Sequence, residues 1–447
     1  MMVQPTTEEN CSAMLCTIAP TETSMDTAAI KMLATELDDA DPLGGFRDEF
    51  FIPQDETGRE IVYLVGNSLG LQPKQTPGFI ERELDAWRSL GVRAHFTGEF
   101  PWMPYHEFLT VPMADIVGAL PTEVVVMNSL TVNLHLMLTT FWRPQGRRIR
   151  ILIEAGAFPS DYIAVESHIR ARGFDPADVM IVVDPREGEE CLRTDDICQL
   201  IDDYHQELAL VLLPGVQYYT GQVFDLPRIA AICQRWGITS GVDLAHAAGN
   251  IELSLHDWNI DFAVWCTYKY LNSGPGSVGG CFVHDRHASR IDLPRLAGWW
   301  GHDKSTRFEM KTEFRAIPTV EGWQLSNPPI ISLAAIRSSL DLFQRAGGMQ
   351  VLTTKSRALT GFLREQLQQR LSEHIAMVTP PGGGCQLSLR VTSDRIPGRQ
   401  VKAKLDAAGF ETDWREPDVI RAAPVPLYNR FADAAAFVQA LEEIFDA

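Results

Sequence analysis

One lysine stands between two tyrosines in the stretch WCTYKYLNSGPG, residues 265–276. Lysine side chains prefer water, yet Lys269 follows an apolar run and precedes a glycine-rich turn. Either its aliphatic stem lies along apolar surface with the charge in solvent, or its amine is held in a sheltered place for chemistry. Shelter favours the neutral, nucleophilic form of an amine. Lys269 is therefore the first candidate catalytic residue.

A carboxylate at the end of the preceding strand pattern is the second candidate. In GVDLAHAAGN an apolar run ends at Asp243, and His246 follows three residues later. A buried carboxylate is costly without a cationic partner, although a helix cap beside a structural histidine is the simpler alternative. Neighbouring parallel strands lie about 5 Å apart, so Asp243 and Lys269 could stand roughly 5–10 Å apart and bracket one flat ring.

This pairing meets the needs of pyridoxal phosphate, whose aldehyde condenses with a lysine and whose pyridine nitrogen pairs with a carboxylate. Two other segments after expected strands could complete such a site. MNSLTVNLHL places Thr131 at a helix start, where phosphate can bind, although an ordinary helix cap is more common. EAGAFPSD offers Phe158 for stacking on a ring, while Ser160 or Asp161 could simply cap a helix.

Two further patterns have ordinary explanations. GPGSVG (274–279) matches a dinucleotide fingerprint, but the residues after it read as a strand, whereas the fingerprint must open a helix. A turn that allows close backbone approach is the better interpretation. His284 and His287 flank a strand end with no further cluster of ligands, so we expect no metal site.

Composition narrows the class of protein. The 447 residues carry a formal net charge of −19, which argues against nucleic acid or an anionic membrane as partner. The eight cysteines form no CxxC pair, as expected for reduced thiols in a cytoplasmic protein. The first thirty residues hold no Lys or Arg and no long apolar run, which is unlike a secretory signal, and no transmembrane segment is expected.

Short apolar runs alternate with helical patterns between residues 115 and 285. Expected strands are Val124–Met127, Arg150–Glu154, Val179–Val183, Leu208–Leu213, Thr239–Asp243, Phe262–Thr267 and Gly279–Val283. The alternation predicts an α/β fold with a mostly parallel central sheet and helices on both faces. Ligands of such sheets bind at the carboxyl ends of the strands, where the candidate residues lie.

The domain boundaries follow from the change of pattern near residue 330. Residues 1–25 are polar and threonine-rich, and we expect a disordered extension. Residues 26–60 should form a segment that packs with a small domain, and residues 61–330 the large cofactor domain. Residues 331–447 should form a smaller C-terminal α+β domain that starts with long helices broken near Gly347-Gly348.

Long stretches of the chain resemble the kynureninase family from about residue 30 to the C-terminus. They are VGNSLGLQPK (65–74), MNSLTVNLHLML (127–138), AFPSDYIAVESH (157–168), YYTGQ (218–222), VDLAHAAGNIELSLHDWNIDFAVWCTYKYLNSGPG (242–276), GWWGH (298–302), LSNPPI (325–330) and IRAAPVPLYNRF (420–431). The resemblance implies a fold-type-I pyridoxal-phosphate enzyme that works as a homodimer with shared active sites. The implied reaction is hydrolysis of L-kynurenine or 3-hydroxykynurenine to L-alanine and anthranilate or 3-hydroxyanthranilate, in tryptophan catabolism and de novo NAD synthesis.

The resemblance also implies roles for single residues. Lys269 is similar to the Schiff-base lysine, Asp243 to the pyridinium partner with His246 beside it, and Tyr268 to a proton relay near the phosphate. The other implied cofactor contacts are Leu130, Thr131, Phe158, Ser160 and Asp161, with Trp299 and Asn327 from the partner subunit. Arg421 is similar to the arginine that binds the substrate carboxylate, a bidentate task that suits guanidinium. Ser68 and His95 match positions at the aromatic end of the substrate.

The same resemblance shows one position that departs from the family pattern and suggests a substrate preference. Pro214 stands where the family often has a hydroxyl residue, so one phosphate contact is either missing or supplied by backbone or water. His95 and Asn327 could bond a ring hydroxyl, and a site built for that bond discriminates against an analogue without it. We therefore expect 3-hydroxykynurenine to be preferred. The alternatives are another fold-type-I enzyme, such as a cysteine desulfurase or aminotransferase, or a metabolite-binding pseudoenzyme.

Overall fold

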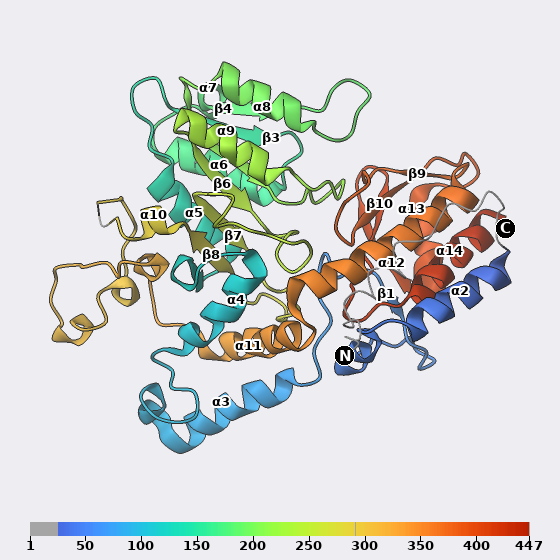
Figure 1. Cartoon of the computed structure of the whole chain (residues 1–447), viewed down its shortest axis with the longest axis horizontal. Helices are drawn as coiled ribbons and strands as arrows, with labels where there is room; N and C mark the ends of the chain where they lie inside the picture. The colour runs from blue at the N-terminus through green and yellow to red at the C-terminus, as the bar shows by residue number, and fades with distance from the viewer. Residues whose placement is uncertain (1–25, 291, 447) are drawn as a thin grey trace, which may run out of the picture.

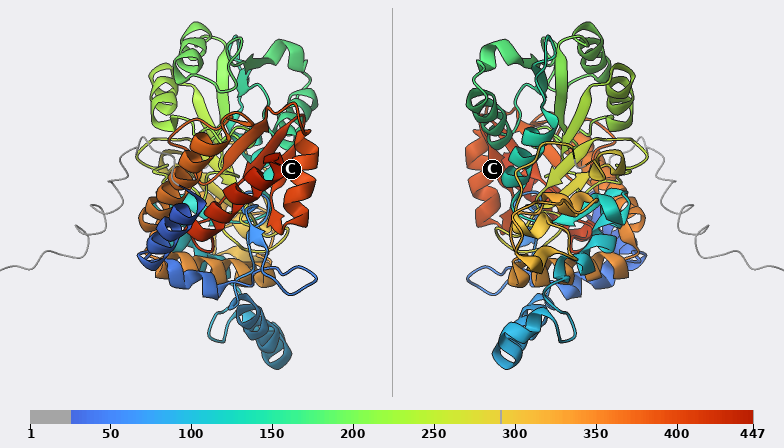
Figure 2. Two further views of the ribbon diagram at one scale, coloured as in Figure 1. Left: turned by 90° about the vertical axis from the view of Figure 1, so that its right-hand side faces the viewer. Right: turned by 90° about the vertical axis from the view of Figure 1, so that its left-hand side faces the viewer.

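The computed structural model describes residues 26–290 and 292–446, so the extension expected over residues 1–25 lies outside the described part. Two bodies are joined by a long helix, α12 (Gly348–Leu371) (Figure 1). The larger body is a sheet layered between helices, and the smaller one gathers most of the C-terminal elements. Figure 2 shows the sheet of the larger body nearly edge-on, with helices on either side.

The central sheet has seven strands in the order β2-β8-β7-β6-β5-β3-β4. Their bounds are β2 (Val124–Val126), β3 (Arg150–Glu154), β4 (Met180–Val183), β5 (Leu208–Pro214), β6 (Thr239–Asp243), β7 (Phe262–Trp265) and β8 (Gly280–Val283). Only β8 runs against its neighbours, β7 and β2, while the other adjacent pairs are parallel. The predicted mostly parallel α/β sheet is confirmed.

Residues of each strand alternate between two cores, one on each face of the sheet. In β5, Val211 and Leu213 join one buried cluster, whereas Leu210 and Leu212 join the other. The layered helices are α4 (Thr110–Val117), α5 (Leu130–Phe141), α6 (Pro159–Ala171), α7 (Pro176–Val179), α8 (Thr194–Asp203), α9 (Leu226–Trp236) and α10 (Asp285–Ala288). Because both faces are covered, the strands read as continuous apolar runs.

Five of the expected strands differ from the structure at one end by one or two residues, and local contacts explain two of these differences. The strand expected to run to Thr267 ends at Trp265, because the Thr267 hydroxyl donates to the Val278 carbonyl and so belongs to the turn that carries Lys269. The strand expected from Val179 begins one residue later, because Asp175 caps a short helix that ends at Val179. Neither difference moves a candidate residue away from the sheet edge.

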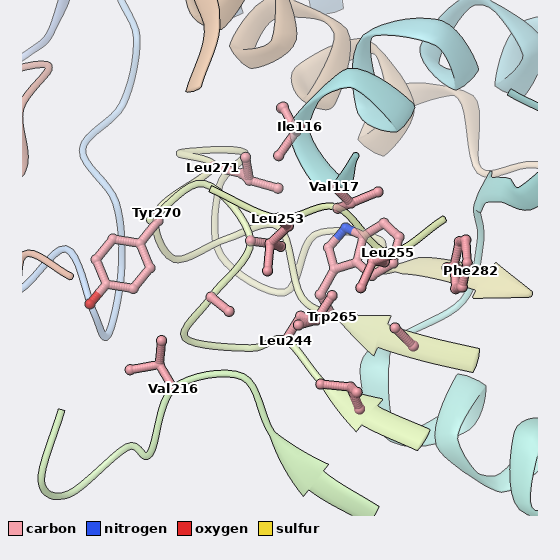
Figure 3. Packing of buried hydrophobic residues seen from close by; sticks show 14 of the residues in the cluster. Ile116, Val117, Val216, Leu244, Leu253, Leu255, Trp265, Tyr270, Leu271 and Phe282 are labelled. Atoms are coloured by element: carbon pink, nitrogen blue, oxygen red, sulfur yellow. The ribbon is translucent and has the colours of Figure 1, made fainter. Parts of the chain in front are cut away.

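The turn after β7 is anchored in the core on both sides of the lysine. Trp265 and Tyr270 are fully buried and belong to the same apolar cluster as Leu244 and Leu271. Figure 3 shows Trp265 packed among Leu244, Leu255 and Phe282, with Tyr270 buried at the other end of the turn. Burying these large rings fixes the backbone of Lys269 between them.

The smaller body has its own sheet and its own core. Four antiparallel strands lie in the order β12-β13-β10-β9, and a parallel pair joins β1 to β11. Their bounds are β1 (Val62–Tyr63), β9 (Ile375–Met377), β10 (Leu387–Val391), β11 (Phe410–Glu411), β12 (Asp413–Arg415) and β13 (Val419–Ala422). Helices α2 (Thr27–Asp39), α12, α13 (Gly398–Ala407) and α14 (Phe431–Asp446) pack on it, with α2 beside α14 (Figures 1 and 2).

The remaining helices are α3 (Thr76–Leu90), α11 (Ile330–Arg345) and short 3₁₀ turns. Helix α3 packs beside α11, and buried residues of α11 join the core of the larger body. The break expected between the long helices occurs at Gly347 and Gly348, whose φ values of 89° and 78° favour glycine. In the described residues no helix is both long and apolar enough to cross a membrane. The six cysteines of that part are free thiols.

Candidate active site

The carboxyl ends of four parallel strands meet at one edge of the central sheet. Pro214 lies opposite Asp243 in the register of β5 and β6, and Asp243 lies opposite Val264 of β7. Glu154 ends β3 on the far side of β5. The turn after β7 brings Lys269 to this edge, which is why two residues 26 apart in sequence face one cavity.

A cavity of about 100 Å³ at this edge, here called the cofactor cavity, collects most of the predicted contacts. Its lining includes Leu130, Thr131, Phe158, Ser160, Asp161, Asp243, His246, Tyr268 and Lys269. Pro214 lines it too and offers no donor, as the sequence indicates. A larger cavity of about 1090 Å³ elsewhere has mostly apolar walls, including Phe51, Trp87 and Ile331. We place the chemistry in the smaller cavity, because titratable groups converge there.

Lys269 and His246 form the central pair of the cofactor cavity. The Nζ atom of Lys269 lies 2.9 Å from Nε2 of His246 and 5.9 Å from the ring centroid of Phe158. Burial, and then the charge of Lys269, lowers the pKa of His246 well below its usual value. The imidazole is therefore neutral and can accept a hydrogen bond from the amine. Nδ1 of His246 is buried without a partner among the described residues.

Two carboxyls face each other across the cavity. Burial, and then the negative charge of Asp243, raises the pKa of Asp161 well above its usual value. Oδ1 of Asp161 is buried without a hydrogen-bond partner among the described residues, so a charge on it would be poorly stabilised. Oδ1 of Asp243 accepts the backbone N–H of Ala245 at 2.5 Å. The raised pKa favours the protonated form of Asp161, while Asp243 ends β6 at the place where a cationic ring nitrogen would meet it.

The start of α5 makes the opposite end of the cavity. The hydroxyls of Thr131 and Ser160 lie 2.9 Å apart at the N-termini of α5 and α6. A Cβ on Gly279 would stand 3.2 Å from the backbone nitrogen of Leu130. Glycine there keeps the free N–H groups of the first turn of α5 accessible, and such groups bind anions. Burial raises the pKa of Tyr268 to about 12, so this phenol is protonated at neutral pH.

Arg421 and Ser68 adjoin the cavity without lining it. Arg421 is fully buried, and its NH1 donates to the carbonyl of Tyr218 at 2.6 Å, while NH2 pairs with Asp413. Ser68 donates to Asp413 at 2.6 Å and lies 3.4 Å from Arg421 NH2. The Nε–H of Arg421 has no partner in the part of the chain that the structure describes. One donor of the guanidinium is therefore free for a ligand.

His95, Trp299 and Asn327 are not among the residues that line the cofactor cavity. Two of them lie near one exposed group of rings, here called the aromatic patch, which consists of Phe96, Trp299 and Phe308. The Phe308 centroid lies 5.6 Å from that of Trp299 and 6.5 Å from that of Phe96, and His95 precedes Phe96. Asn327 is exposed in the loop before α11. A single chain does not bring these residues to its own cavity.

Sequence reasoning missed several residues that line the cofactor cavity, among them Tyr218 and Glu154. Tyr218 lines it with its ring 5.1 Å from Phe158, and its carbonyl holds Arg421. Glu154 lines it from the end of β3. An acid at a strand end is the signal that identified Asp243, and the same signal was present at Glu154. Nothing local in YYTGQ marks Tyr218, because its contacts come from distant segments.

The expectation that His284 has no neighbouring ligands is wrong. Ligand atoms of His284, Glu123, His256 and Asp285 lie within 4.8 Å of one another. Glu123 already accepts from His256 Nδ1 at 2.9 Å and from the backbone N–H of Asp285 at 2.8 Å. These hydrogen bonds account for the buried carboxylate, while His287 pairs separately with Asp261. The sequence missed the cluster because Glu123 and His256 are remote from His284.

Solved structures that share this fold include a cystine C–S lyase and a cysteine desulfurase. A cystine C–S lyase in complex with cysteine persulfide matches with a TM-score of 0.72 at 18% identity, over 86% of this chain and 97% of that one. A cysteine desulfurase from Escherichia coli matches with a TM-score of 0.72 at 16% identity, over 90% of this chain and 98% of that one. Identity this low shows the fold alone, and the predicted fold-type-I class is confirmed.

Sequence comparison separates this chain from those enzymes. Residues 352–441 match the family described as the kynureninase C-terminal domain. A kynureninase of Xanthomonas oryzae pv. oryzae is 54% identical over 412 residues, 92% of this chain and 97% of that protein. A kynureninase of Myxococcus xanthus is 53% identical over 413 residues, 92% of this chain and 96% of that protein. The chain is therefore an enzyme of the kynureninase family.

Proposed function

We propose that this enzyme binds pyridoxal phosphate in the cofactor cavity and hydrolyses the side chain of L-kynurenine and 3-hydroxykynurenine. The products are L-alanine and anthranilate or 3-hydroxyanthranilate, and the 3-hydroxy substrate is preferred. The observation that carries the proposal is the convergence of Lys269, His246 and Asp243 on one cavity at the sheet edge. The membership of the kynureninase family favours this function over a desulfurase or a pseudoenzyme.

The donor set of the cavity fits pyridoxal phosphate. A lysine amine, a buried carboxylate and a helix N-terminus with two hydroxyls are the groups that the aldehyde, ring nitrogen and phosphate require. Phe158 lies where its ring could stack on the pyridine, since Lys269 Nζ is 5.9 Å from its centroid. Backbone N–H groups at Leu130 and Thr131 would supply the phosphate contact that Pro214 lacks.

When bound, the cofactor supplies an aldehyde for a lysine amine and a pyridinium ring that withdraws electrons from the substrate. The chain's own residues then move protons. Lys269, held by neutral His246, is the base for the proton on Cα of the substrate. Water adds to the γ-carbonyl carbon, the Cβ–Cγ bond breaks, and Cβ gains a proton. Tyr268 is the donor proposed for Cβ, because its phenol is protonated at neutral pH.

Arg421 is the residue proposed to bind the α-carboxylate of the substrate. Its Nε–H has no partner among the residues described, and two of its other contacts, Tyr218 and Asp413, hold the guanidinium in place. Charge-assisted hydrogen bonds of this kind are short and strong. Ser68, bound to the same Asp413, would lie beside the substrate.

We propose a homodimer in which the rim residues His95, Trp299 and Asn327 complete the site of the partner subunit. The aromatic patch supports this, because Phe96 is 63% exposed, Phe308 55% and Trp299 43%. Exposed apolar groups of this size mark interaction surfaces. His95 and Asn327 would then meet the aromatic ring of the substrate and bond its 3-hydroxyl.

The organisation of the chain belongs to the same proposal. Residues 61–330 would form the cofactor domain and residues 331–447 the small domain, with residues 26–60 packing on the small domain. The buried cluster that unites Ile30 and Ala34 with Leu363 and Phe437 supports the last assignment. We place the enzyme in the cytoplasm, in tryptophan catabolism and de novo NAD synthesis.

A paired assay tests the proposed function. The purified chain would be incubated with pyridoxal phosphate and either L-kynurenine or 3-hydroxykynurenine, and alanine and the matching anthranilate would be quantified. We expect both substrates to be turned over, the 3-hydroxy compound with the higher kcat/KM. Equal or reversed rates would contradict the preference, and no product from either substrate would contradict the activity.

A further inference from the structure

Glu154 is a buried carboxyl that the proposed reaction does not use. Only 3% of the residue is exposed, and it forms part of the wall of two cavities. One is the cofactor cavity. The other, here called the side cavity, has about 280 Å³ and is also lined by Glu190, Tyr219 and Glu416. Glu154 therefore stands between the catalytic groups and a second, separately lined space.

The hydrogen bonds around Glu154 leave room for a proton. Oε1 of Gln217 accepts the backbone N–H groups of Tyr219 at 2.6 Å and Thr220 at 2.8 Å. The amide nitrogen of Gln217 must therefore point the other way, toward the carbonyl of Gly156 at 2.9 Å and toward Glu154. Oε2 of Glu154 is buried with no partner in the described ranges. A charge on that oxygen would be poorly stabilised.

Charged groups face Glu154 from every side. Asp243 of β6 and Asp161 of α6 share the cofactor cavity with it, together with Lys269 and His246. Glu190 and Glu416 face it across the side cavity, where Glu190 is paired with Arg390. Burial, and then the charge of Asp243, raises the pKa of Glu154 to about 8. Three neighbouring buried carboxyls cannot all be ionised at neutral pH.

We propose that Glu154 is a positioning residue that holds a proton beside Asp243 and exchanges it with water through the side cavity. A proton on Glu154 keeps its charge away from Asp243, the proposed partner of the cofactor's ring nitrogen. The proton on Glu154 comes from water in the side cavity and returns there, so no bond to substrate forms or breaks. The inference rests on the proposed function of the cofactor cavity.

The consequence is a proton-linked change in the cofactor's surroundings. When Glu154 loses its proton, its negative charge appears beside the cofactor cavity, and the absorption and circular dichroism of the bound cofactor should change. The cofactor-loaded enzyme would be titrated from about pH 6 to about pH 10. We expect a spectral step near pH 8 in the wild type, set by the pKa of Glu154.

Two variants identify the group whose titration causes the spectral step. Glu154→Gln imitates the protonated carboxyl at every pH and should abolish it. Glu190→Gln removes a carboxylate from the solvent side of the same cavity and should leave the step in place. A step that survives Glu154→Gln with an unchanged midpoint would overturn the inference, because another group would then be titrating.

A second measurement decides the matter if Glu154→Gln fails to fold. The infrared spectrum of wild-type holoenzyme labelled with ¹³C-glutamate should contain the C=O band of a protonated glutamate at about pH 6.5, and this band should vanish by about pH 9.5. Its absence at the lower pH would overturn the inference. A wild-type chain that binds no pyridoxal phosphate would refute the proposed function and this inference together. A loaded enzyme without the step would refute the inference alone.

Discussion

Two groups of predicted site residues occupy very different parts of the molecule. The first, which we call the floor, consists of Asp243, His246 and Lys269. The second, which we call the rim, consists of His95, Trp299 and Asn327. The floor residues leave neighbouring strands of one sheet and line one cavity in a single chain. The rim residues lie outside the lining of that cavity, His95 and Trp299 on short 3₁₀ turns and Asn327 on a loop.

The difference reflects how each group is held. The floor is anchored by two fully buried rings, Trp265 and Tyr270, which flank Lys269 in sequence. Packing of these rings in the core therefore fixes the positions of the floor side chains. The rim has no such anchor in one chain, since Trp299 is 43% exposed and donates only to the carbonyl of Arg307 within the described residues. The floor should therefore work as part of its own subunit, and the rim only in an assembly.

Removing the lysine of the floor should have the largest effect. Lys269→Ala takes away both the cofactor linkage and the proposed base, and loss of a general base alone costs about 10²- to 10⁴-fold in rate. We expect turnover of both kynurenines to fall at least that far while the far-ultraviolet circular dichroism is unchanged. Lys355→Ala is a poor control because Lys355 pairs with buried Asp41. The exposed Lys311→Ala is suitable and should keep full activity.

A substitution of Arg421 tests a residue of the smaller body that lies next to the floor. Arg421→Lys keeps the charge beside Asp413 but loses the free Nε–H, so we expect KM to rise by roughly 1.5–3 kcal/mol of binding, about ten- to a hundredfold. The value of kcat should change much less. Arg415→Lys is the matched control, because Arg415 contacts the same Asp413 at 3.0 Å from a more exposed position. Equal effects from the two variants would contradict the clamp.

How well the sequence predicts each group depends on how far apart in the sequence its contacting residues lie. Asp243 and Lys269 were predictable because parallel strands align their carboxyl ends, and local sequence marks those ends. Glu154 carried the same mark and was missed. The pairing of Arg421 with Asp413 depends on the register of β12 and β13, and the contact between Phe96 and Phe308 joins loops more than 200 residues apart. No local periodicity encodes such contacts, so only the resemblance to a family indicated the rim.

Acid should weaken the segment 299–323, which contains Trp299 of the rim, through the partly buried carboxylate of Glu321. Burial alone would raise the pKa of Glu321, but His106 and Lys304 outweigh it and lower the pKa to about 2. Nε2 of His106 lies 2.9 Å from Glu321, and Lys304 also contacts it at 2.8 Å, tying residues 299–323 to the rest of the chain. Because the folded pKa is depressed, this stabilisation is fully present above the unfolded pKa of about 4.3 and is lost as pH falls toward 2.

Glu321→Gln should therefore cost about 1–2 kcal/mol of unfolding free energy at pH 7. The difference in unfolding free energy between wild type and variant should shrink as pH falls below about 4.5, for as long as both remain folded. Urea unfolding at several pH values measures it. Glu309→Gln removes an exposed partner of Lys311 in the same segment and should change little. A gap that stays constant with pH would show that Glu321 acts through packing and not through its charge.

The smallest effect is expected at His95, and it separates the rim from the floor most directly. His95→Phe removes one hydrogen bond to a ring hydroxyl, so kcat/KM for 3-hydroxykynurenine relative to kynurenine should fall by about 1 kcal/mol, roughly fivefold. His205→Phe, which removes a histidine stacked on Trp236 elsewhere on the surface, is the control.

Mixed subunits then show whose site His95 serves. A dimer of one His95→Phe subunit and one Lys269→Ala subunit pairs an intact lysine with the partner's intact histidine. If the rim completes the partner's site, the one active site of such a dimer has a wild-type rim and should show the wild-type substrate preference. After random mixing of the two subunits, these sites make up about a quarter of all sites. If each chain supplied its own rim, every active site would carry the His95→Phe change. The preference would then stay reduced, and the contrast between floor and rim would lose its basis.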